Sequence, residues 1–81
     1  MKVRVLRDLV ENQTLAALKE AEEAIIHDEP LAFKVEGSNL SEKLTNIIAA
    51  INILEKMNEV HMEFEKALEE YSKKIKEPIL D

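Results

Sequence analysis

Between Gly37 and Pro78 the chain runs for forty residues without a glycine or a proline. Within this run, side chains suited to a buried face recur every three or four residues, as they do along one side of an amphipathic helix. These positions are Leu40, Leu44, Ile47, Ile51, Leu54, Met57, His61, Phe64, Leu68, Tyr71 and Ile75. The pattern predicts either one long helix over 40–76 or two helices in close succession.

Length favours the two-helix interpretation. An unbroken helix over 40–76 would be about 55 Å long, whereas a compact chain of this size has a radius of gyration of roughly 12 Å. The rest of the chain could not cover such a helix. Asn58, Glu59 and His61 interrupt a run of strong helix formers, so we expect a break between Asn58 and Met62, with helices at about 40–58 and 62–76.

The N-terminal third predicts two more helices. Apolar residues from Val3 to Val10 have helical spacing, which favours a helix at about 3–11, with a strand at Lys2 to Leu6 as the alternative. Thr14 is a suitable cap for a second helix at about 14–27. The stripe of this second helix consists of Leu15, Leu18, Ala21, Ile25 and Ile26.

Between the second and third helices the pattern changes to alternation. Asp28, Glu29 and Pro30 end the helix, because the residue before a proline is pushed out of the helical region. Apolar and polar residues then alternate over 31–36, which predicts an extended segment with one buried face. This segment could serve as a plain linker, pair with the N-terminal segment or pair with its symmetry mate.

Local signals also place the start of the third helix. Gly37 permits the turn into it, and Asn39 with Glu42 forms the pattern of a capping box. The expected fold is therefore mainly all-α, a small bundle of three to four helices in a single domain over residues 1–81.

Composition indicates that such a bundle needs a partner. The chain is 46% hydrophobic but has one Tyr, two Phe and no Trp, so its interior must be aliphatic. A core of this size is marginal unless association adds burial. We therefore predict a homodimer in which the third helix meets its mate. The expected dimer and core stripe consists of Leu40, Leu44, Ile47, Ile48, Ile51, Leu54 and Met57.

The charge balance limits the other partners. Eleven basic and seventeen acidic side chains give a formal charge of −6, which repels nucleic acid and anionic lipid. No apolar run is long enough for a membrane span or a signal peptide. There is no cysteine, so disulfides and thiol chemistry are excluded. We expect a cytoplasmic protein that binds neither nucleic acid nor membrane.

Sites for catalysis or metal are weakly indicated. The chain has no glycine-rich phosphate loop and no Gly-x-Ser-x-Gly, so we expect no catalysis and no cofactor. His27 lies four residues after Glu23, and His61 four before Glu65, and such pairs can hold zinc or iron. With seventeen acids, a carboxylate near each histidine is expected by chance. We predict no bound metal.

Several phrases of the sequence together resemble a family of similarly short, acidic, uncharacterised bacterial proteins. They are the opening from Val3 to Glu11, Ala21 to Ala24, the extended stretch from Pro30 to Gly37, Glu42 to Thr45, Ala49 to Ile51, and Ala67, Leu68 and Tyr71. The resemblance covers nearly the whole chain and implies no established activity. Members of that family are sometimes encoded near thiol-redox proteins, which implies at most an accessory role and transfers no site residue.

The leading hypothesis is a homo-oligomeric helical interaction module that acts as a small adaptor or regulator of another protein, without catalysis. One alternative is a helical bundle that binds a metal or a small molecule through His27 or His61. The other is an accessory protein to a thiol-redox enzyme, which depends on the resemblance alone.

Overall fold

The computed structural model describes residues 2–78. Its helices are α1 (Val3–Asn12), α2 (Leu15–Ile26), α3 (Leu40–Val60) and α4 (Phe64–Ile75). This confirms the mainly all-α bundle, with each helix end within two residues of its expected position. The outer ends of the domain predicted over 1–81 lie outside the described residues.

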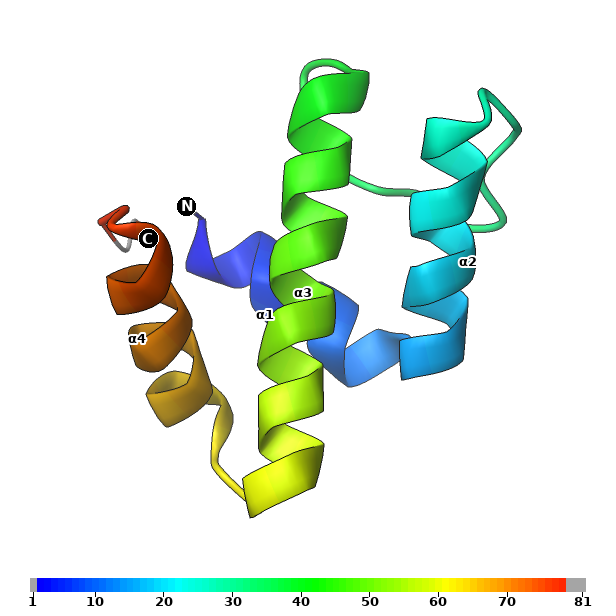
Figure 1. The fold of residues 1–81 in the computed structure, drawn as a ribbon. Coiled ribbons are helices and arrows are strands. Elements are labelled where there is room, and N and C mark those ends of the chain that lie inside the picture. The colour runs from blue at the N-terminus through cyan, green and yellow to red at the C-terminus, as the bar shows by residue number, and fades with distance from the viewer. Residues whose placement is uncertain (1, 79–81) are drawn as a thin grey trace.

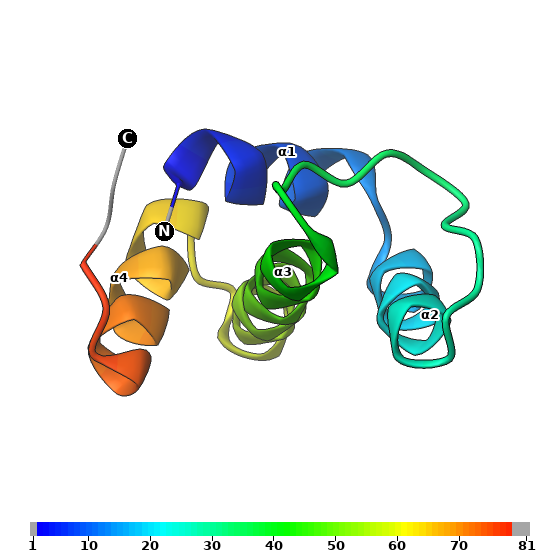
Figure 2. The same cartoon turned by 90° about the horizontal axis from the view of Figure 1, so that it is seen from above.

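Three helices lie side by side in one layer, with α3 in the middle between α2 and α4 (Figure 1). Both neighbours run antiparallel to α3. The view from above shows that α1 crosses one face of this layer, whereas none of the helices described covers the opposite face (Figure 2). The Cα radius of gyration is 12.0 Å, the value expected of a compact chain of this length.

The first segment is a helix from Val3 onward, so the alternative of a strand at Lys2 to Leu6 is wrong. Val5 and Leu6 are both buried, as are Leu9 and Val10. Adjacent residues of a strand point to opposite faces, but residues spaced by one, four and five share one side of a helix. The helix therefore lets α1 bury all four side chains together.

Local signals set both ends of α2. Thr14 accepts a hydrogen bond on Oγ1 from the Ala17 amide at 3.1 Å, as expected of an N-cap. The helix ends at Ile26, before the proline takes effect, because Asp28 adopts a left-handed conformation with φ 55°. The Glu29 amide then donates to the Ala24 carbonyl at 2.7 Å, which closes the helix in the manner of a Schellman motif.

The segment over 31–36 is extended and has the predicted buried face. Val35 is 3% exposed, and Leu31 and Phe33 pack partly buried against the core, whereas Ala32 and Lys34 are exposed. It has no strand partner within residues 2–78, so in this chain it is a linker and does not pair with the N-terminal segment.

Gly37 is required at the turn into α3. Its φ is +155°, and a Cβ at this position would lie 2.9 Å from the Lys43 amide nitrogen. Asn39 caps the helix, because its Oδ1 accepts from the Glu42 amide at 2.9 Å. The Glu42 carboxylate accepts in return from the Ser38 amide at 3.2 Å. The capping box is thus present, but the amide that donates to Glu42 is that of Ser38, one residue before the cap residue Asn39.

The chain turns between α3 and α4, so the alternative of one unbroken helix over 40–76 is wrong. Helix α3 continues through Asn58 and ends at Val60, and His61 follows in a left-handed conformation with φ 53°. The turn allows α4 to bury Phe64, Ala67 and Leu68. A straight helix would leave this apolar face uncovered by the chain itself.

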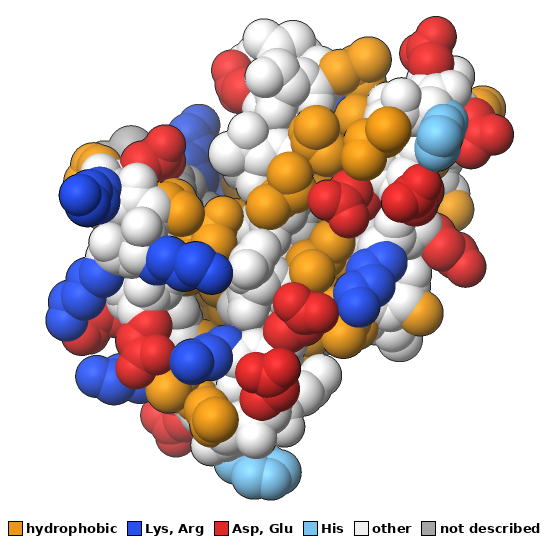
Figure 3. Space-filling model, in the orientation of Figure 1, with side chains coloured by type: hydrophobic (Ala, Val, Ile, Leu, Met, Phe, Trp, Pro, Cys, Tyr) orange, Lys and Arg blue, Asp and Glu red, His pale blue; other side chains and the backbone are white. Residues whose placement is uncertain are grey.

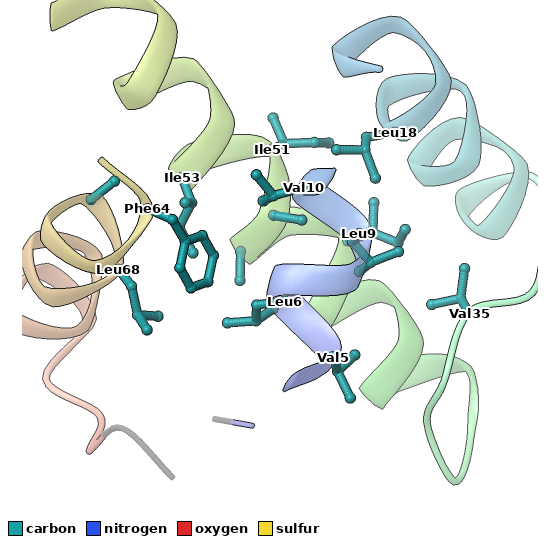
Figure 4. Close-up of a cluster of buried hydrophobic side chains, with 14 of the residues drawn as sticks. Val5, Leu6, Leu9, Val10, Leu18, Val35, Ile51, Ile53, Phe64 and Leu68 are labelled. Carbon is teal, nitrogen blue, oxygen red and sulfur yellow. The ribbon is translucent and has the colours of Figure 1, made fainter. Parts of the chain in front are cut away.

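The core lies between α1 and the three-helix layer, as Figure 4 shows. Ile51 of α3 points toward Leu18 of α2, and Ile53 points toward Phe64 of α4. The side chains of Leu6, Leu18, Ile47 and Ile53 are fully buried. The interior is aliphatic, apart from Phe64, as the composition requires.

Candidate interaction surface

The predicted stripe divides into a covered part and an uncovered part along α3. Ile47 and Ile51 are buried, Leu54 and Met57 are partly buried and packed against the core, Leu44 and Ile48 are half-buried, and Leu40 is 53% exposed. The end of the stripe nearest the start of α3 is therefore the part that this chain leaves open.

The buried side of α3 is displaced from the predicted stripe because of where its neighbours lie. Helices α2 and α4 flank α3 and α1 crosses behind it, so Ala49, Ala50 and Ile53 are buried as well. At about 100° per residue, Ile48 lies nearly opposite Ala50. Ile48 thus belongs to the side of α3 that faces away from α1.

One residue of α2 extends this open side. The Lys19 ammonium lies 3.4 Å from the Glu55 carboxylate, which brings these sides of α2 and α3 together. Ile26 follows Lys19 by seven residues, or two turns, and Ile48 precedes Glu55 by the same spacing. Ile26 and Ile48 therefore flank the same gap between the helices, and Ile26 is 58% exposed.

We call Ile26, Leu40, Leu44 and Ile48 the apolar strip. Figure 3 shows hydrophobic side chains gathered on this face over the half of α3 that follows the linker and the adjoining side of α2. Polar residues beside the strip bond to their own helix: Thr45 donates to the Ser41 carbonyl at 3.0 Å, and Asn52 donates to the Ile48 carbonyl at 2.8 Å. The Thr45 hydroxyl proton and one of the two amide protons of Asn52 are thereby used within the helix, which lowers the cost of covering these side chains with an apolar partner.

The opposite face is held by two ion pairs that involve α1. Arg4 donates from both Nη atoms to the Glu36 carboxylate, at 2.8 and 2.9 Å, and ties α1 to the linker. Arg7 donates to Glu65 at 2.8 Å and ties α1 to α4. The hydrogen bonds from these arginines hold the pKa of Glu36 and that of Glu65 below their usual value. These contacts brace the fold and lie away from the apolar strip.

The two histidines lie far apart, at different helix ends. His27 is at the end of α2, with Nε2 3.1 Å from the Glu23 carboxylate, and both side chains are largely exposed. His61 is exposed in the turn before α4. Over residues 2–78, no group of three or more histidine or acidic side chains is placed to hold a metal ion.

A shallow hollow of about 380 Å³ lies between α3 and α4. Its lining includes Asn52, Glu55, Lys56, Glu70, Tyr71 and Lys74. Lys56 lies 3.9 Å from Glu70, and burial, followed by the charge of Glu77, raises the pKa of the Tyr71 phenol. The lining contains both acids and lysines, so the hollow does not select a ligand of one charge.

Sequence reasoning missed the long-range contacts and one part of the strip. Arg4 and Glu36 are separated by 32 residues and Arg7 and Glu65 by 58, and no local pattern marks such pairs. The sequence pattern places Ile26 on the covered stripe of α2, yet this side chain is exposed. Its position directly before the helix end, next to His27 and Asp28, was the available signal.

The chain belongs to the family of unknown function DUF6952, whose family model matches residues 1–79. This confirms the resemblance to a family without an established activity. No curated protein and no solved structure matches the chain. Among the helices described, none combines the length and the hydropathy that crossing a membrane would require.

Proposed function

We propose that this member of the family is a homo-oligomeric helical interaction module. In this proposal it acts in the cytoplasm as a small adaptor or regulator of another protein and performs no chemistry itself. The observation that carries the proposal is the apolar strip, which the fold leaves open although its three α3 residues belong to the helical stripe of the sequence.

The composition of the strip favours a helical partner. It presents four large aliphatic side chains, of which Ile26 and Leu40 are more than half exposed. A contiguous apolar surface of this kind is typical of a contact with another protein. Leu40, Leu44 and Ile48 are spaced by four residues, as are the anchors that a facing helix would contact.

A second copy is the occupant we propose, because it presents the same strip. In a twofold symmetric contact the surface must be complementary to itself, and an aliphatic surface without a central charge satisfies this condition. Each buried apolar Å² contributes about 25 cal/mol. Association thus adds the burial that a chain of 81 residues lacks.

Sedimentation equilibrium at micromolar concentration tests this proposal. We expect twice the chain mass for the wild type and the mass of one chain for Ile48→Glu, because the substitution places a carboxylate in the centre of the contact. Asn58→Glu is the matched control, since it adds the same charge at an exposed position of the same helix. A monomeric wild type would disprove the proposal, and so would an Ile48→Glu variant that associates as tightly as the wild type.

A further inference from the structure

We propose that the turn between α3 and α4 is a hinge through which two copies exchange α4. In the exchanged dimer, residues 40–75 form one continuous helix in each chain, and α4 of each copy occupies the place of α4 in the other. This contact uses a different surface from the apolar strip, so the two proposals stand or fall separately.

The hinge consists of only three residues, 61–63, and none of them is glycine or proline. His61 holds the turn with φ 53°. The left-handed conformation is unfavourable for a residue with a Cβ, and straightening the chain relieves it. Straightening also allows the residues of the turn to join the hydrogen-bond ladder of the helix.

The sequence register across the hinge fits a continuous helix. Phe64 follows Ile53 by eleven residues, and Leu68 follows Met57 by the same number. Eleven residues complete three turns with an excess of about 20°. In a straight helix, the side chains that α4 now buries would therefore lie on the same face as the α3 side chains that now face α4.

Val60 supports the same arrangement. It is the last residue of α3 and is 51% exposed. Tyr71 follows it by eleven residues, so Val60 also lies on the side of the straight helix that would face the partner. A twofold axis at the hinge would bring the two copies of Val60 near each other and cover them.

The exchanged dimer keeps the contacts of the compact chain. Because α4 runs antiparallel to α3 (Figure 1), a straight helix places its α4 half antiparallel beside α3 of the other copy. Phe64, Ala67 and Leu68 would fill the same core positions there. The bond between Arg7 and Glu65 and the approach of Lys56 to Glu70 would form between chains.

Exchange relieves the unfavourable backbone conformation of the hinge but costs the entropy of bringing two chains together. The exchanged fraction therefore depends on protein concentration. Residue 61 sets this balance. Glycine adopts the left-handed turn readily and weakens a helix, whereas alanine has the opposite preferences. For each hinge, the equilibrium constant for α4 exchange should be about tenfold larger with His61→Ala than with His61→Gly. A dimer has two hinges, so its formation should differ by about a hundredfold between the two variants.

Cross-linking between chains tests the exchange. The chain has no cysteine, so Lys56→Cys and Glu70→Cys can be made in two separately tagged chains, both carrying Ile48→Glu to remove the strip contact. The two chains are mixed at several concentrations and treated with a short bismaleimide. Lys56 and Glu70 lie close together within one chain, so a covalent pair of different chains forms when α4 has been exchanged.

We expect the yield of this covalent pair to rise with concentration, to rise further with His61→Ala and to fall with His61→Gly. Val60→Glu should also lower it, because two carboxylates would meet at the twofold axis, while leaving the thermal stability of the single chain unchanged. A yield that is the same for glycine and alanine at position 61 would overturn the proposal, as would the absence of the pair at all concentrations.

Discussion

Arg7 on α1 donates a hydrogen bond of 2.8 Å to the carboxylate of Glu65 on α4, which joins two segments 58 residues apart. The same guanidinium lies over the ring of Phe64, 4.6 Å from its centre. The cation thus binds both the acid and the aromatic ring of the first turn of α4. This relationship fixes where α4 begins relative to α1.

The first prediction concerns acid. Because the pKa of Glu36 and that of Glu65 are lower in the folded chain than the ordinary value of 4.5, the unfolded chain binds protons first as the pH falls. The stability that these ion pairs contribute is complete above about pH 4.5, and it is lost as the pH falls through the pKa values of the folded chain. Urea unfolding between pH 7 and pH 3 measures it.

Glu65→Gln should reduce this dependence on pH, because it removes one of the titrating groups. Glu20→Gln, at an exposed position of α2, is the control and should leave the profile unchanged. If Glu65→Gln and the wild type lost stability in parallel, the Arg7 pair would not be the cause.

The second prediction concerns alkali and uses the only tyrosine of the chain. Burial raises the pKa of Tyr71 above 10.0, so an absorbance titration should place its ionisation above that value in the folded chain and at the ordinary value in urea. Because the folded pKa is the higher one, stability is full below pH 10 and declines as the pH rises through the folded value. Tyr71→Phe should remove this decline, and an unshifted titration would show that the phenol is not buried in the hollow between α3 and α4.

The third prediction concerns the buried side of α3. Ile51→Asp should lower the free energy of unfolding by about 3 kcal/mol or more, because it buries a carboxylate against Leu18 of α2. The acid should then have a raised pKa. Chemical unfolding followed by circular dichroism measures the loss, and Glu55→Ala on the open side should change it by only about 0.5 kcal/mol. Equal stability of Ile51→Asp and the wild type would show that this side is assigned wrongly.

The fourth prediction concerns the turn into α3. Gly37→Ala should reduce stability by about 1–3 kcal/mol, because the turn needs a φ of +155° and the new Cβ would crowd the Lys43 amide. Ser38→Ala is the neighbouring control, since its backbone amide can still donate to Glu42. Urea midpoints of the two variants decide the matter, and a Gly37→Ala midpoint at the wild-type value would refute the strained turn.

The sequence determined the local features of this protein. Thr14 and Asn39 begin their helices where the sequence placed them, because a capping bond joins residues only three positions apart. The linker buries Val35 and leaves Lys34 exposed, because alternate side chains of an extended segment point to opposite sides. Such features depend on a few neighbouring residues along the chain, so the amino-acid sequence is sufficient to determine them.

Tertiary structure decided how those pieces are used. Whether Ile48 or Ala50 faces the core depends on where α1, α2 and α4 pack, and the aliphatic stripe of α3 is wide enough to permit either choice. The sequence likewise does not decide whether the chain turns at His61, since the spacing from Ile53 to Phe64 suits a straight helix as well as a turn. The chain turns because this covers Phe64 and Leu68, and the free energy of that burial arises only when segments distant in sequence come together.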